Sequence, residues 1–396
     1  MNAMKNEMVR YLRERLLPFW QSLRDDQNGG YISYVGQDLS RDPMGERGCI
    51  LNSRILWFFS AASRALGDAS LLPYAEHAYK ALLTMLDGEH GGVYWSVTAQ
   101  GRVLDGTKHT YNQAFAIYAL SAYAEASGRK EPLALAYQLF DLIESRCTDE
   151  IGYLEAHKAD WTPESNEKLS ENGVMAEKTM NTLLHVLEAY TELYRVDGSG
   201  KVKDRILFIL HLLEEKIYNP QKRRQEVFFD REYHSLIDLS SFGHDVETSW
   251  LADRTLEVLG DEEMTRRIRP MLMDMAQEVY ETAFTGDGFM NERHDTQVDT
   301  TRIWWVQAEA LVGFLNAWEK TGEEKFLSAA RSQWQYIKDK MIDPRENSEW
   351  FWSVDEKGVP IPGKPIVEPW KCPYHNGRMI FEVMERSSHA HVSANQ

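Results

Sequence analysis

Cysteine is scarce in this 396-residue sequence, which contains only Cys49, Cys147 and Cys372. The three are far apart and form no Cys-x-x-Cys pair, which argues against a disulfide framework and a zinc ribbon. No apolar run approaches the roughly 18 residues of a membrane span. The N-terminal segment MNAMKNEMVRYLRERLL lacks the apolar core and the cleavage site of a signal peptide. We therefore expect a cytoplasmic protein with no membrane partner.

Basic charge is also in short supply, with 44 Lys and Arg against 61 Asp and Glu and a formal net charge of −17. A nucleic-acid binder needs a clustered cationic face, and no basic block is present, so we expect no nucleic-acid partner. The hydrophobic fraction of 43% is too high for a disordered chain. Tryptophan, in contrast, is abundant: the twelve tryptophans exceed what core packing requires, and their excess needs a functional explanation.

Short glycine turns recur along the chain at spacings of 61, 70, 62 and 62 residues. Glycine just past a helix end relieves the left-handed conformation there, so each turn is expected to join two helices. The segment before each turn is apolar nearly all round, as in Tyr111–Tyr123, and the segment after it is amphipathic. The glycines of these turns are Gly67, Gly128, Gly198, Gly260 and Gly322.

Each unit is thus interpreted as a buried inner helix followed by an outer helix, and long connections with aromatic and glycine motifs predict short β-hairpins between units. A sixth inner helix, about 375–387, lacks an outer partner, and an N-terminal amphipathic helix, about 4–24, lacks an inner one. Joining these ends predicts an all-α (α/α)6 barrel. The alternative is an open α-solenoid. We expect one catalytic domain over residues 1–388 and a flexible tail over 389–396.

In such a ring the inner helices begin on the face that carries the long connections, where function is expected. Polar and aromatic residues gather at these helix starts and are predicted to line one cavity. They are Arg54, Tyr111, Asn112, Asn181, His185, His244, Glu247, Trp250, Trp304, Trp305, Glu309, Trp370, His375 and Arg378.

Histidine is the most informative member of this set. A single helical histidine is more often structural than functional, but His185, His244 and His375 on three inner helices are harder to dismiss together. A helix N-terminus favours the neutral imidazole, which can accept a proton. Glu247 lies three residues after His244, on the same helix face, and could orient it. The same spacing can hold a metal, but no second such pair occurs, and we expect no metal.

The aromatic residues could simply be core. Aromatic faces next to Arg, Asn and Glu also suit sugar rings, whose C–H faces stack while their hydroxyls form hydrogen bonds. A neutral carbohydrate is therefore the ligand class that the composition of the cavity favours.

Several long segments, LNSRILWFFS, KHTYNQAFAIYALSAY, GHDVETSWL, TRIWWVQAEALVGF and WKCPYHNGRM among them, resemble the N-acylglucosamine 2-epimerase superfamily and, within it, the cellobiose 2-epimerases. The likeness extends over about residues 8–385. Asn52 is a departure, because the family pattern has histidine there; Arg54 remains in place. The resemblance implies an (α/α)6 barrel and a reversible epimerisation at C2 of the reducing-end sugar of a β-1,4-linked disaccharide such as cellobiose or mannobiose, without a cofactor. We expect it to act as a monomer.

The resemblance also implies roles. His244 and His375 exchange the C2 proton on opposite faces of the sugar through an enediolate, and His185 assists ring opening or polarises O1 and O2. Arg54 and Asn181 hold the carbonyl and C2 oxygens, Glu247 orients His244, and Trp305 and Trp370 stack on the sugars. The remaining residues of the set are expected to bind substrate.

Three other functions stay open at this stage. An aldose–ketose isomerase, such as a mannose isomerase, or an N-acylglucosamine 2-epimerase would have the same fold. An (α/α)6 glycosidase would need two carboxylates across the scissile bond rather than histidines. A non-catalytic sugar-binding barrel would need only the stacking residues.

Overall fold

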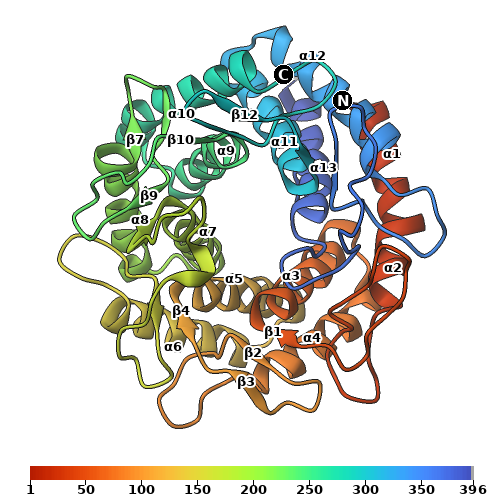
Figure 1. Cartoon of the computed structure of the whole chain (residues 1–396), viewed down its shortest axis with the longest axis vertical. Coiled ribbons are helices and arrows are strands. Elements are labelled where there is room, and N and C mark those ends of the chain that lie inside the picture. Colours follow the sequence, from red (N-terminus) through yellow and green to blue (C-terminus); the bar gives the residue numbers. More distant parts are fainter. Residues whose placement is uncertain (394–396) are drawn as a thin grey trace.

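The computed structural model describes residues 1–393, with side chains through residue 387, and its helices form two concentric rings (Figure 1). The inner ring consists of α3 (Cys49–Leu66), α5 (Thr110–Ser127), α7 (Met180–Asp197), α9 (Phe242–Leu259), α11 (Trp304–Thr321) and α13 (His375–Ser393). The outer ring consists of α1 (Asn2–Tyr11) continued by η1 (Leu12–Leu16) and α2 (Leu17–Gln21), α4 (Leu72–Leu83), α6 (Glu131–Arg146), α8 (Gly200–Leu212) continued by η4 (Leu213–Ile217), α10 (Glu262–Thr282), and α12 (Glu324–Tyr336) continued by η5 (Ile337–Met341).

The ring is closed, as the unpaired ends of the sequence predict. Helix α13 packs against both α11 and α3, and α1 packs against α13, so the first and last helices of the chain are neighbours (Figure 1). The (α/α)6 barrel is therefore confirmed and the open solenoid is wrong. Within residues 1–393 no helix is both long and apolar enough to cross a membrane.

The glycine turns take the conformation that their sequence predicts. The five glycines have φ between 61° and 72°, the left-handed region in which a side chain would be strained. Each follows the last residue of an inner helix, and Asp68 and Asp261 then cap the next helix through their carboxylates. Every inner helix therefore runs in the same direction, and the six long connections gather on one face.

Strand pairs join these long connections around the ring, in addition to local hairpins. The strand that precedes an inner helix pairs with the next connection along the chain, so each connection is tied to its neighbour. These pairs are β1 (Arg47–Gly48) with β2 (Ser96–Val97), β4 (Lys108–His109) with β5 (Ala156–His157), β6 (Lys178–Thr179) with β9 (Phe228–Phe229), β10 (Leu239–Ser241) with β11 (Glu292–His294), and β13 (Arg302–Ile303) with β14 (Ser353–Val354). Local hairpins are formed by β2 with β3 (Val103–Asp105), β7 (Tyr218–Asn219) with β8 (Arg224–Gln225), and β11 with β12 (Gln297–Asp299). Two single-turn helices, η2 (Ala69–Leu71) and η3 (Glu167–Leu169), lie between the longer elements.

Buried ion pairs reinforce this belt of strands. A cation just before an inner helix bonds a carboxylate in the turn that follows the preceding outer helix, and both partners are almost fully buried. Removing one partner of such a pair strands a buried charge, which typically costs about 3–5 kcal/mol. The pairs are Arg47–Asp25 at 2.8 Å, Lys108–Asp87 at 2.5 Å, Lys178–Asp149 at 2.9 Å, and Lys371–Glu349.

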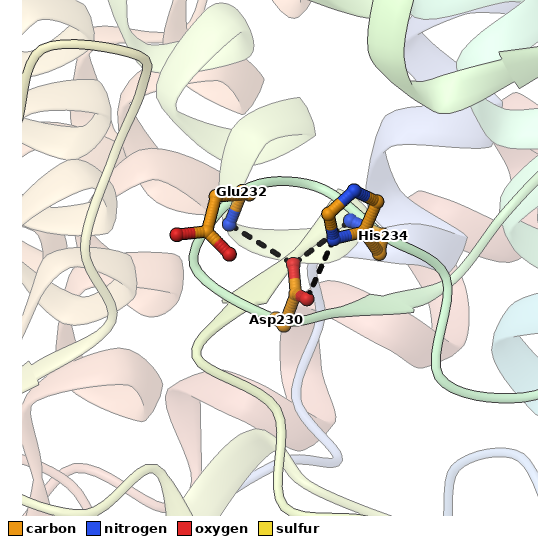
Figure 2. Close-up of side chains that lie close together, drawn as sticks. All are labelled: Asp230, Glu232 and His234. Carbon is orange, nitrogen blue, oxygen red and sulfur yellow. Dashed lines mark hydrogen bonds and ion pairs between the residues drawn. The ribbon is translucent and has the colours of Figure 1, made fainter.

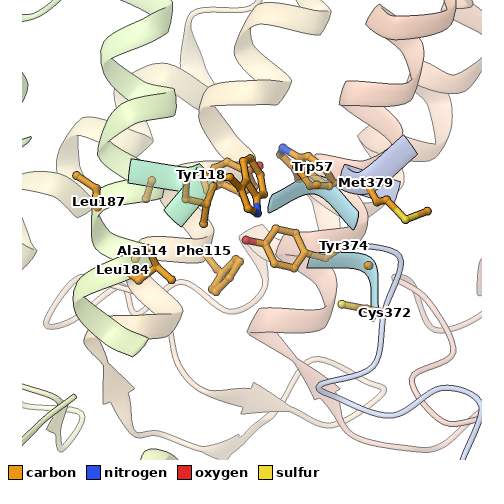
Figure 3. Close-up of a cluster of buried hydrophobic side chains, with 14 of the residues drawn as sticks. Trp57, Ala114, Phe115, Tyr118, Leu184, Leu187, Cys372, Tyr374 and Met379 are labelled. Carbon is orange, nitrogen blue, oxygen red and sulfur yellow. The ribbon is translucent and has the colours of Figure 1, made fainter. Parts of the chain in front are cut away.

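The centre of the ring is packed with aromatic side chains (Figure 3). Trp57 of α3 stacks on Tyr118 of α5 with 5.4 Å between ring centroids, and Tyr374 packs against both Trp57 and Phe115. The barrel therefore has a filled middle layer, with the starts of the inner helices on one side and the glycine turns on the other.

The C-terminal boundary expected at residue 388 does not coincide with a change of secondary structure. Helix α13 continues to Ser393, so residues 389–393 of the expected tail are helical. Residues 394–396 lie outside the described residues.

Gly313 of α11 gives a test of how closely the inner helices pack. A Cβ at this position would overlap Cγ2 of Val246 in α9 and lie 3.1 Å from the Val246 carbonyl oxygen. We expect Gly313→Ala to lower the free energy of unfolding by about 1–3 kcal/mol, measured by urea unfolding, because the two backbones must separate. The control is Gly200→Ala, whose Cβ meets no atom within 4 Å. Equal losses in the two variants would contradict the close contact.

Candidate active site

Three histidines from three inner helices lie together at the face of the long connections. His185 comes from α7, His244 from α9 and His375 from α13. The indole ring of Trp305 contacts two of them, with centroid distances of 4.7 Å to His244 and 5.5 Å to His375. Tyr374 lies 4.6 Å from His375 and 6.2 Å from His185. The predicted convergence of the histidines is present.

Each of these histidines is held through Nδ1. Glu188 bonds His185 at 2.9 Å and Glu309 bonds His375 at 2.7 Å, whereas His244 bonds the hydroxyl of Ser241 at 2.7 Å. A carboxylate can only accept, so Nδ1 of His185 and of His375 carries a proton. The ring nitrogen that remains for chemistry is thus Nε2 on both.

The expected pairing of Glu247 with His244 is wrong. Glu247 accepts a hydrogen bond from Arg378 and lies 3.9 Å from Nδ1 of His375. Side chains on a helix lean toward its N-terminus, and His244 therefore reaches back to Ser241, the residue before the first turn, rather than forward to Glu247. Glu247 supports the other histidine instead.

Arg378 holds the carboxylates beneath the histidines. It is 3% exposed and donates hydrogen bonds to Glu188, Glu247 and Glu309, on α7, α9 and α11. Its guanidinium lies 4.8 Å from the ring of Trp250, and the indole N–H of Trp250 donates to Glu309 at 2.9 Å. The expectation that Arg378 and Trp250 contact substrate is therefore not supported, because both are occupied below the histidines.

The single guanidinium of Arg378 lies among three carboxylates, so negative charge is in excess. The pKa values of the three carboxyl groups are shifted in different directions. Burial and the charge of Glu309 raise the pKa of Glu247 to about 7, and burial raises the pKa of Glu309. Burial would also raise the pKa of Glu188, but Arg378 and the hydrogen bond from His185 outweigh it and lower that pKa to about 2. Glu188, beside His185, is consequently ionised at neutral pH.

Burial raises the pKa of a carboxyl group but lowers the pKa of an imidazole, and it does so for both His244 and His375. It lowers the pKa of His244 to about 3, with a smaller contribution from His185. Burial, Arg378 and Arg54 hold the pKa of His375 well below its ordinary value. Both imidazoles are therefore neutral at neutral pH in the substrate-free protein, which is the state that accepts a proton.

Arg54 of α3 lies between the rings of Phe115 and Tyr374, at 4.2 Å and 4.6 Å from their centroids. It donates to the hydroxyl of Tyr111 at 2.9 Å and to the carbonyl of Trp370 at 3.2 Å. The structure therefore places Arg54 and Tyr111 together, next to the first residues of α13.

Of the two candidate asparagines, only Asn181 is available to a ligand. Asn112 is buried as a helix cap: its Oδ1 accepts from the backbone N–H of His109 at 3.0 Å and its amide donates to the Tyr94 carbonyl at 3.1 Å. The prediction that Asn112 binds substrate is therefore not supported. The Oδ1 atom of Asn181, in the first turn of α7, has no hydrogen-bond partner among the described residues.

The tryptophans divide into two groups. Trp95, Trp305, Trp352 and Trp370 are partly exposed at the long-connection face, and Trp370 lies 5.7 Å from Trp95 and 5.9 Å from Tyr111. A cavity of about 210 Å³ beside Trp95 and Trp370 is also lined by Glu46, Ile50 and Glu368. Trp250 and Trp304 are 1% and 4% exposed, so the prediction that they line a cavity at the helix starts is wrong.

Three residues of the site escaped sequence reasoning. Glu188 follows His185 by three positions, a spacing that could have identified it. Ser241 precedes the first turn of α9, where serine is a common cap. Tyr374, whose hydroxyl bonds Glu188, carried no signal beyond its place before His375.

Among the residues that the structure describes, two groups of side chains have the composition of metal ligands. In the first, Glu247, Glu309 and His375, the guanidinium of Arg378 already supplies a cation to both carboxylates. The second, Asp230, Glu232 and His234, lies in the turn after β9 (Figure 2). There Asp230 accepts from the backbone N–H of Glu232 and of His234, and from the His234 ring at 2.8 Å, so its oxygens close the turn. Neither arrangement favours a metal centre.

Comparison with known proteins agrees with this geometry. Cellobiose 2-epimerase of Eubacterium cellulosolvens is 48% identical over 400 residues, which cover 96% of this chain and 98% of the relative. Cellobiose 2-epimerase of Ruminococcus albus is 48% identical over 384 residues, covering 97% and 99%. The structure of cellobiose 2-epimerase from Bacillus thermoamylovorans superimposes with a TM-score of 0.94 at 44% identity, covering 98% of this chain and 100% of that one. The family model described as N-acylglucosamine 2-epimerase matches residues 29–376. The resemblance inferred from the motifs is thereby confirmed: the chain belongs to the N-acylglucosamine 2-epimerase family.

Proposed function

We propose that this protein is a cofactor-independent carbohydrate 2-epimerase that interconverts cellobiose and 4-O-β-D-glucosyl-D-mannose, with mannobiose as a second substrate. The observation that carries the proposal is the pair of neutral, oriented imidazoles, His244 and His375, on the ring of Trp305. Inversion at C2 needs one acid–base group on each face of the sugar, and this pair provides two. The relatives named cellobiose 2-epimerase support the disaccharide substrate.

The reaction acts on the open-chain aldose, in which the C2 hydrogen is acidic because it is next to the C1 carbonyl. One histidine removes this proton through Nε2, the electrons move to O1, and an enediolate forms. The other histidine, carrying a proton, returns it to C2 on the opposite face. Arg54, Tyr111 and Asn181 are the donors and acceptors that we assign to O1 and O2, where preorganised dipoles stabilise developing charge.

Ring opening precedes this step and supplies the protonated histidine. We assign His185 as the donor to the ring oxygen, because the neighbouring Glu188 remains charged and stabilises an imidazolium. The proton of the anomeric hydroxyl passes to the histidine that later protonates C2. His185 donates one proton and the other histidine takes one up, so the charge of the site is unchanged when the open-chain sugar forms.

The other functions are less well supported. A glycosidase needs two carboxylates facing the scissile bond, whereas Glu247 and Glu309 are bound to Arg378 below the histidines and are each 1% exposed. A single incubation with cellobiose and with mannobiose in D₂O, followed by NMR, decides among the reactions. We expect the C2 epimer with deuterium at C2; ketose or monosaccharide as the main product would refute the proposal.

The two-base scheme predicts that neither His244→Ala nor His375→Ala forms the epimer, with a loss of at least about 10³-fold. The two variants should differ in isotope exchange, because each retains one base. In D₂O, one variant should introduce deuterium at C2 of cellobiose without inversion. The other variant should introduce deuterium at C2 of the mannose epimer without inversion. Epimer formation near the wild-type rate in either variant, measured by NMR, would contradict the scheme.

Glu309 is predicted to orient His375 for chemistry. Glu309→Gln keeps the size of the side chain but can present an N–H to Nδ1, which favours the wrong tautomer of the imidazole. We expect kcat to fall by about 10²–10⁴-fold while KM changes little. Glu232→Gln, on the exposed turn, is the control and should retain full activity. An unchanged kcat in Glu309→Gln would remove Glu309 from the mechanism.

Ser241 is predicted to position the imidazole ring of His244. Ser241→Ala removes the hydroxyl that contacts Nδ1, so the ring loses one neutral hydrogen bond, equivalent to about a tenfold decrease in kcat. The matched control is Ser240→Ala, because the neighbouring hydroxyl accepts from Arg293 instead. Equal activity of the two variants would show that Ser241 does not position His244.

A further inference from the structure

A second and larger cavity lies on the far side of the aromatic layer, toward the glycine turns. Its volume is about 580 Å³, within the range of small-molecule sites. Arg64 and Arg195 line it from the last turns of α3 and α7, a few residues before Gly67 and Gly198. The cavity is therefore separate from the long-connection face, where the histidines lie.

Three side chains form a wall shared by this cavity and the histidine site. Glu188, Trp250 and Arg378 all line the cavity. The same three residues hold the catalytic layer: Glu188 bonds His185, Trp250 bonds Glu309, and Arg378 bonds both carboxylates. One layer of side chains thus separates the two chambers.

Two polar groups on the cavity wall have no partner. Trp57 and Tyr118 are 6% and 7% exposed, and in the described part of the chain neither the indole N–H nor the phenol hydroxyl forms a hydrogen bond. Their rings stack at an interplanar angle of 18°, and Phe381 packs edge-on to Trp57 (Figure 3 shows Trp57 and Tyr118). Both groups line the cavity and are available to a ligand there that supplies an acceptor.

The charged residues around the cavity are balanced. Arg195 bonds Glu192 at 2.7 Å and Arg254 bonds Glu385 at 3.2 Å, so cations and carboxylates alternate along the wall. Such a lining attracts neither an anion nor a cation strongly, but it offers both donors and acceptors to hydroxyl groups. Donors and acceptors beside the polar edges of Trp57 and Tyr118 match the hydroxyl groups of a sugar.

We propose that the 580 Å³ cavity is a second carbohydrate-binding site, which takes a neutral mono- or disaccharide against Trp57 and Tyr118. A sugar bound there contacts Glu188 and Arg378. Because Glu188 bonds His185, the sugar changes the orientation of His185. The binding itself does not depend on the proposed epimerase function; only its effect on turnover does.

Equilibrium dialysis of the full chain with radiolabelled cellobiose tests the site. We expect two equivalents bound per wild-type chain and one in the double variant Trp57→Phe/Tyr118→Phe, which removes both unpartnered groups and keeps two aromatic rings. The matched control, Trp334→Phe, removes an indole whose N–H bonds Glu7 on the outer ring and should bind two equivalents. One equivalent in all three proteins, or two in all three, would overturn the proposal.

Crystals of the wild-type chain soaked in cellobiose give a second measurement that does not depend on a variant folding. Sugar density within hydrogen-bond distance of the Trp57 indole nitrogen or the Tyr118 hydroxyl is the expected result, and density at the histidines alone would refute the site. Epimerisation is followed separately by NMR. Two bound equivalents without any epimer would refute the proposed reaction and leave the second site standing.

Discussion

The buried guanidinium of Arg378 is the interaction on which the rest of the site depends. It binds carboxylates from three inner helices other than its own, and those carboxylates in turn hold His185 and His375. A charge this deep is stable only while its partners surround it, and the partners repel one another without it. Burial raises the pKa of Glu247 and of Glu309, and the neighbouring carboxylates raise it further. His375 is therefore oriented by a carboxylate from another inner helix, whereas His185 and His244 bond residues three positions away in the chain.

The strand pairs between neighbouring connections also matter for the site, because they hold the N-terminal ends of the inner helices next to one another. Five of the six inner helices, all but α13, are entered through a two- or three-residue strand that pairs with the next connection, and a buried cation ties several of those entries to the preceding outer helix. The two histidines that we propose as acid and base nevertheless have unlike supports, a carboxylate on His375 and a hydroxyl on His244.

Sequence reasoning predicted the ring and the identity of the histidines but not their supports. The inner and outer helices could be inferred because Gly67 and its equivalents, together with hydrophobic periodicity, are local signals. The partner of His375 could not be inferred, because Glu309 and His375 are separated by 66 positions, whereas Glu188 and Ser241 each lie three positions from the histidine they bond. Local spacing gave a wrong prediction for Glu247, because its carboxylate accepts a hydrogen bond from Arg378 instead of contacting His244. Asn112 and Trp250 were likewise taken for ligand contacts, although they satisfy buried neighbours.

The sequence by itself therefore determined the repeating helix pair, the closure of the ring and the set of chemical groups at the helix starts, because turn glycines, periodicity and residue type act over a few positions. The tertiary structure alone decided which tryptophans face the mouth, which carboxylate serves which histidine, and that a second cavity lies behind the same residues. These features depend on the distances between helices that meet only when the ring closes, and no short-range pattern encodes those distances.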